Sequence, residues 1–140
     1  MKKKAIIVSG YFNPLHKGHI EYFRQARKCG DMLFVIVNND FQRELKGSSE
    51  FMNQDERLLI INELQITDKS FISIDKDRTV SKTLEQIHIN HSSKFELYFA
   101  NGGDQTNELI PEKLICEKLS IKMIDNLGDK IQSSSWLLKK

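Results

Sequence analysis

The chain has 140 residues, enough for one domain with a hydrophobic core and too few for two. Hydrophobic residues make up 39% and charged residues 29% of the chain, a composition typical of a globular protein in water. The net charge of +2 excludes the strong positive field that nucleic-acid binding usually needs, and no apolar run is long enough to span a membrane. Because Cys29 and Cys116 lack motif partners and no signal peptide is visible, we expect a cytoplasmic protein with reduced thiols.

Short apolar runs alternate with amphipathic segments along the chain, and they predict strands and helices in turn. The predicted strands cover residues 4–9, 32–37, 70–74, 95–100 and 120–124. The predicted helices cover residues 17–29, a segment capped by Asn53, and residues 81–89 and 111–118. The polar stretch 38–53 is predicted to be a long loop. In the helix after Asn53, the buried face is predicted from four residues, Leu58, Leu59, Ile61 and Leu64.

Strands separated by helices predict an α/β fold, a doubly wound parallel sheet with helices on both faces, in one domain over residues 1–140. In such sheets, ligands bind at the carboxyl ends of the strands. The loops after the first, second and fourth strands should therefore meet at one crevice.

The stretch from Gly10 to His19 reads GYFNPLHKGH and joins the first strand to the first helix. Backbone N–H groups at a helix N-terminus point at an anion, and His16 and His19 are spaced to face the same side of the first turn. Gly18 leaves room for a ligand to approach the backbone. A zinc site would need third and fourth ligands, and no Cys or His cluster accompanies the pair. We therefore interpret this stretch as a phosphate-binding site.

This stretch resembles the HxGH signature of the nucleotidyltransferase superfamily, whose members join a nucleoside triphosphate to a phosphorylated small molecule and release pyrophosphate. Cytidylyltransferases for glycerol 3-phosphate and phosphocholine belong to it, as do adenylyltransferases for phosphopantetheine, nicotinamide mononucleotide and heptose phosphates. The resemblance implies a Rossmann-like sheet with strand order 3-2-1-4-5, a homodimer, and Mg²⁺ bound with the triphosphate.

The resemblance also implies residue roles. His16 and His19 would donate hydrogen bonds to phosphate oxygens during transfer. Their pKa is expected to lie near the ordinary value of roughly 6.5, and nearby phosphates would favour the protonated, charged form of each ring. Lys46 and Arg57 match a lysine and an arginine of the glycerol-phosphate cytidylyltransferases, so Lys46 is expected to be catalytic and substrate-binding. Arg57 is expected to clamp the acceptor phosphate bidentately. Solvated side chains are the alternative for both, and Arg43 and Arg78 are weaker candidates of the same kind.

Two further motifs match the superfamily. Gly102-Gly103-Asp104 follows the fourth strand, and Asp104 is expected to contact substrate, base or a metal-bound water. Ser133-Ser134-Ser135 would bind phosphates at a helix start, although Lys130 replaces an arginine common in cytidylyltransferases. The nucleotide-binding residues implied are Gly10, Tyr11, Phe12, Asn13, His16, Gly18, His19, Gly102, Asp104, Ser133, Ser134 and Ser135. No metal-binding residue is assigned.

The expected reaction transfers CMP from CTP to a phosphorylated polyol or sugar of the glycerol 3-phosphate type. ATP is the alternative, because Asn13-Pro14 is more like the adenylyltransferases for nicotinamide mononucleotide or phosphopantetheine. A non-catalytic nucleotide-binding module is the second alternative. An aminoacyl-tRNA synthetase fragment is disfavoured, because 140 residues leave no room for tRNA recognition and no KMSKS-like motif is present.

Overall fold

The computed structural model describes residues 2–102 and 110–127. Its five strands are β1 (Lys3–Gly10), β2 (Met32–Val37), β3 (Lys69–Ile72), β4 (Phe95–Gly102) and β5 (Lys122–Leu127). All neighbouring strands pair in parallel, in the order β3-β2-β1-β4-β5, which confirms the predicted sheet and its strand order.

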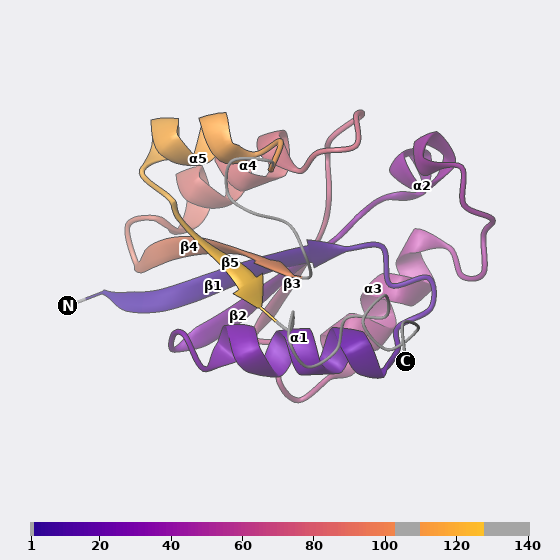
Figure 1. Cartoon of the computed structure of the whole chain (residues 1–140), viewed down its shortest axis with the longest axis horizontal. Helices are drawn as coiled ribbons and strands as arrows, with labels where there is room; N and C mark the ends of the chain where they lie inside the picture. The colour runs from indigo at the N-terminus through magenta and orange to yellow at the C-terminus, as the bar shows by residue number, and fades with distance from the viewer. Residues whose placement is uncertain (1, 103–109, 128–140) are drawn as a thin grey trace.

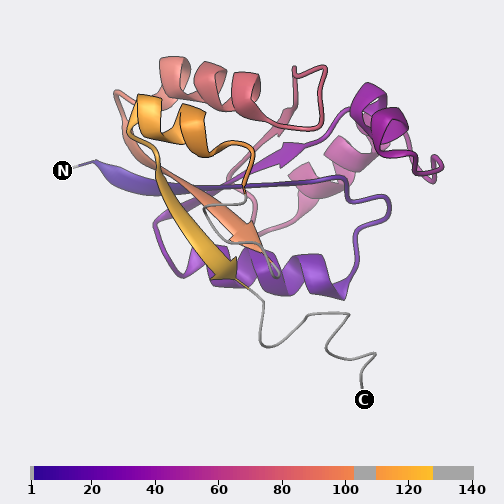
Figure 2. The same cartoon turned by 45° about the horizontal axis from the view of Figure 1, so that its top comes forward.

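The five helices are α1 (Lys17–Arg27), α2 (Asp40–Lys46), α3 (Gln54–Glu63), α4 (Ser81–His91) and α5 (Lys113–Leu119). Helices α1 and α3 cover one face of the sheet, and α4 and α5 cover the other (Figure 1). In the tilted view, α2 lies apart from both layers, beyond the carboxyl end of β2 (Figure 2). None of the helices described is long and apolar enough to cross a membrane.

The core is two apolar layers separated by the sheet, because successive side chains of a strand point to opposite faces. In β1, Ile6 and Val8 pack with Phe23 of α1, whereas Ala5 and Ile7 pack with Leu84 of α4. All four β1 residues are fully buried. A strand buried on both faces reads as a continuous apolar run, which is why β1 and β2 were predictable from sequence.

The predicted loop at residues 38–53 is wrong in part, because α2 forms within it. Asn39 starts this helix with a reciprocal capping box: its side chain accepts from the Gln42 N–H, and the Gln42 side chain accepts from the Asn39 N–H. Asn53 caps α3 by accepting from the Glu56 N–H, as predicted. The predicted buried face of α3 is corrected at Leu59, which is 62% exposed, while Arg57 takes a core position.

Candidate active site

The loop after β1 turns sharply around a buried aromatic ring. Phe12 has a positive φ of 52° and packs edge-on against Phe23 and His19, with ring centroids 5.4 and 4.9 Å apart. A Cβ atom on Gly10 would lie 2.7 Å from the Phe12 ring, so only glycine lets the ring fold back under the end of β1. Phe12 thus acts as the packing anchor of the loop, with its buried ring beneath His19.

His16 and His19 form a stacked pair at the N-terminus of α1, with ring centroids 3.9 Å apart. The Nδ1 atom of His16 accepts from the Gly18 N–H at 3.0 Å, and the Nδ1 atom of His19 accepts from the His16 N–H at 3.1 Å. Because each Nδ1 is an acceptor, the proton of each neutral ring lies on Nε2. The helix start therefore presents two Nε2–H donors beside the positive end of its dipole.

Burial, followed by the positive charges of His16 and Lys46, lowers the pKa of His19 to about 4. His19 is thus neutral at pH 7 in the free protein, which corrects the expectation of a pKa near 6.5. The unfolded chain binds more protons between pH 6.5 and 4, so this group's contribution to stability is lost as the pH falls through that interval.

We predict that an NMR titration of the His19 imidazole in the free protein has its midpoint near pH 4. A bound triphosphate should raise the midpoint, because nearby negative charge favours the protonated ring. The signal can be assigned by its loss in His19→Asn. A midpoint near 6.5 without nucleotide would contradict the buried, cation-flanked position.

Gly18 has a different role from the one expected. A Cβ atom there would lie 2.9 Å from the His16 ring, so the missing side chain makes room for His16 itself. We predict that Gly18→Ala displaces this ring and, since the resemblance assigns His16 to transfer, lowers turnover by about 10²-fold, the cost of misplacing such a group by about 1 Å. Thermal unfolding should change little, since alanine favours the helix. Unchanged turnover would contradict this reading of Gly18.

Two neighbouring pockets open at the carboxyl end of β1. The smaller pocket, of about 470 Å³, is lined by Asn13, His16 and His19. The larger pocket, of about 870 Å³, extends toward Glu112. Their shared lining is Ser9, Gly10, Tyr11 and Lys46. The Lys46 ammonium, at the end of α2, lies 4.4 Å from the centre of the Tyr11 ring. The structure therefore brings Lys46 to the boundary between the histidine pair and the larger pocket.

Arg57 is not placed as predicted. Its side chain is fully buried: Nη1 donates to the carbonyl oxygens of Tyr11 and Asn38 at 2.8 and 2.7 Å, and Nε donates to Met52 O at 3.1 Å. Its Nη2 donates to Asp40 Oδ1 at 2.7 Å. With these bonds made, no pair of donors remains for a phosphate fork. The substrate clamp is therefore replaced by a structural role, joining the β1 loop, the end of β2 and the start of α2.

Asn13 also tethers the loop. Its Oδ1 accepts from the N–H groups of Phe51 and Met52, both at 3.0 Å, and its Nδ2 donates to Ser49 O at 2.8 Å. Its side chain is thus directed at residues 49–52, and the predicted nucleotide contact stays a prediction for its backbone.

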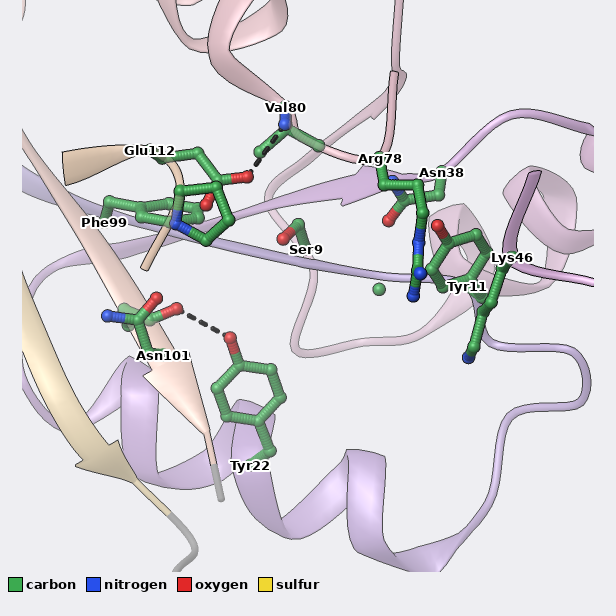
Figure 3. Close-up of a pocket in the computed structure, with 13 residues that line it drawn as sticks. Ser9, Tyr11, Tyr22, Asn38, Lys46, Arg78, Val80, Phe99, Asn101 and Glu112 are labelled. Carbon is green, nitrogen blue, oxygen red and sulfur yellow. Dashed lines mark hydrogen bonds between the residues drawn. The ribbon is translucent and has the colours of Figure 1, made fainter. Parts of the chain in front are cut away.

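The larger pocket receives one cation from the segment before α4. Arg78 extends toward Lys46 and Tyr11 (Figure 3), in a segment held by Gln42, whose Nε2 donates to Asp77 O and Thr79 O at 2.7 Å each. Buried Asp75 accepts from Lys82 N and Thr83 N, which fixes the start of α4. Sequence reasoning missed Gln42, although its spacing from Asn39 matches a capping box.

Several predicted site residues lie outside the described residues: Asp104, Lys130, Ser133, Ser134 and Ser135. Gly102 is described and is the last residue of β4, so the predicted loop begins later than expected. Within residues 2–102 and 110–127, no group of three His, Cys, Asp or Glu side chains could hold a metal ion.

A parallel sheet with order 3-2-1-4-5, combined with a helix N-terminus that presents paired imidazole donors, defines a nucleotide-binding α/β domain. The cytidylyltransferase-like family matches residues 7–134. The chain belongs to this family of nucleotidyltransferases.

Similarity to individual proteins is moderate. The chain is 29% identical to the bifunctional protein HldE of Wolinella succinogenes over 141 residues, covering 99% of the chain and 27% of that protein. It is 30% identical to the FAD synthase of Thermoplasma volcanium over 94 residues, covering 65% of the chain and 66% of that protein. The chain thus spans about a quarter of HldE and just under two thirds of the FAD synthase.

A solved structure shares the fold. The lipopolysaccharide core biosynthesis protein of Thermoplasma volcanium superposes with a TM-score of 0.71 at 24% identity, covering 89% of this chain and 96% of the other. At this identity the likeness concerns the fold.

Proposed function

We propose that the protein transfers a nucleoside monophosphate from a nucleoside triphosphate to the phosphate of a small molecule. An oxygen of the acceptor phosphate attacks the α-phosphorus, the new P–O–P bond forms, and the bond to the β-phosphate oxygen breaks to release pyrophosphate. No covalent protein intermediate is needed, so positioning and charge stabilisation supply the catalysis.

The observation that carries this proposal is the histidine pair at the start of α1, with both Nδ1 atoms engaged and both Nε2–H groups left as donors. Such donors fit the oxygens of a triphosphate, on which negative charge grows as pyrophosphate leaves. Lys46, at the boundary between the two pockets, would screen the repulsion between the triphosphate and the acceptor phosphate. Mg²⁺ would enter with the triphosphate, held by its oxygens.

We propose CTP as the nucleotide and a phosphorylated polyol or sugar as the acceptor. ATP is the second candidate, favoured by the relatives named FAD synthase, because FAD contains an adenine nucleotide. A cytoplasmic homodimer is the assembly we expect from the resemblance.

The test is pyrophosphate release by the purified chain with Mg²⁺ and each of four nucleoside triphosphates. The acceptors are glycerol 3-phosphate, phosphocholine, ribitol 5-phosphate, other sugar phosphates, phosphopantetheine, nicotinamide mononucleotide and FMN. Release with one pair would identify base and acceptor together. Nucleotide binding without release from any pair would contradict the transfer reaction and favour a binding module.

A further inference from the structure

The larger pocket has opposite charges at its two ends. Lys46 and Arg78 lie at one end, beside Tyr11, and Glu112 lies at the other (Figure 3). Among the described residues, neither cation forms an ion pair with a carboxylate, and Glu112 forms none with a Lys, Arg or His. The cavity of about 870 Å³ between them is large enough for a sugar-sized molecule.

The cationic end adjoins the histidine pair through Lys46, so it is the end where an acceptor phosphate would meet the α-phosphorus. A phosphorylated molecule bound in this direction extends its other end along Ser9 and Asn38 toward Glu112.

The Glu112 carboxylate is held in place by two backbone N–H groups, that of Val80 and its own. Its Oε2 accepts from the Val80 N–H at 2.9 Å, although the residue is only 8% exposed. A buried carboxylate normally has its charge matched by a cation or by several hydrogen bonds. Burial, with Asp75 and Asp77 nearby, raises the pKa of Glu112. A hydroxyl group can donate to the ionised carboxylate and accept from the protonated form, whereas an ammonium group pairs only with the ionised form, so a hydroxyl partner fits this side chain in either state.

We propose that Glu112 accepts a hydrogen bond from a hydroxyl group of the acceptor and so selects a phosphorylated polyol or sugar. This proposal rests on the proposed function and adds a specificity residue to it. Glu112 is the N-cap residue of α5, and its partner Val80 lies directly before α4. The residue that selects the acceptor is therefore on different chain segments from the histidine pair.

The informative variant is Glu112→Gln. Its side-chain oxygen can still accept from the Val80 N–H, so the fold contact is kept, while an NH₂ donor replaces the second carboxylate oxygen. Glu117→Gln is the matched control, because Glu117 is exposed on the same helix. Thermal unfolding of each variant would verify that the fold is retained.

The experiment compares glycerol 3-phosphate and ribitol 5-phosphate with propyl phosphate, which lacks hydroxyls, and with phosphoethanolamine, which carries an ammonium. CTP and ATP are each used as donor. In the wild type, the hydroxylated acceptors should have the higher kcat/KM. In Glu112→Gln, the KM of the hydroxylated acceptors should rise about 3- to 10-fold, the range for losing an ordinary hydrogen bond. The ratio of kcat/KM for the hydroxylated acceptors to kcat/KM for propyl phosphate should shrink. The KM of the nucleotide should change little in Glu112→Gln, and all kinetic constants of Glu117→Gln should stay close to those of the wild type.

Three outcomes would overturn the proposal: an unchanged acceptor KM in Glu112→Gln, a changed nucleotide KM instead, or a wild-type preference for phosphoethanolamine. The second outcome would assign this pocket to the nucleobase. If the wild type releases no pyrophosphate with any acceptor, the proposed function fails and this proposal fails with it. Release by the wild type with an unaffected variant contradicts only the role of Glu112.

Discussion

Replacing His19 with asparagine is expected to lower kcat about 10²- to 10³-fold, while the Kd of the triphosphate changes by less than about threefold. Asparagine keeps a short acceptor that can bind the His16 N–H, so the start of α1 remains capped. What it removes is the Nε2–H donor. The loss should therefore fall on the transition state, where charge develops on the leaving pyrophosphate.

This prediction is checked by steady-state kinetics together with direct nucleotide titration. His88→Asn, on α4 away from both pockets, is the control and should retain full turnover. If kcat/KM and nucleotide affinity fall by the same factor while kcat stays unchanged, His19 serves ground-state binding alone.

Replacing Arg57 with methionine is expected to lower the free energy of unfolding by about 3–5 kcal/mol, because three carbonyl groups lose their donor and Asp40, with a 31% exposed side chain, loses its cation. Arg57→Lys should recover only part of this loss, because one ammonium cannot reproduce a planar fork with separately directed donors. Urea unfolding monitored by circular dichroism measures the difference.

The control is Arg24→Met. Arg24 has a 62% exposed side chain, and its contact with Glu21 is a surface pair, so its loss should cost less than about 1 kcal/mol. If Arg57→Lys were as stable as the wild type and raised only the acceptor KM, the result would contradict the structural role and support the predicted binding of the acceptor phosphate by Arg57.

The sheet could be predicted from sequence because its signals are local. The apolar runs of β1 and β2 are bounded by polar residues. Because both faces of these strands are buried, apolar residues follow one another without alternating with polar ones, and each run is easy to recognise. The GYFNP turn and the two histidines likewise lie within ten residues, so the start of α1 was recognisable as an anion site.

Arg57 could not be predicted, because most of its partners lie far away in sequence. Two of its three carbonyl partners belong to residues 46 and 19 positions upstream. A charged residue on a helix is normally solvated, and nothing local indicates otherwise. Glu112 was missed for the same reason: its partner, the Val80 N–H, lies 32 residues away. Helix α2 has only seven residues, too few for a periodic pattern, and the Asn39–Gln42 spacing was its one signal.

The division of the site between chain segments has a consequence for how new activities could arise. The histidine pair that we propose for transfer belongs to the β1–α1 connection, whereas Arg78, Val80 and Glu112 come from the segments that enter α4 and α5 on the opposite layer. The effects of substitutions are coupled when the residues are in contact and nearly additive when they are far apart. Arg78, Val80 and Glu112 can therefore mutate with little disturbance of the histidine pair. A lineage could therefore exchange one acceptor for another by changing these two short segments, while the histidine pair is kept.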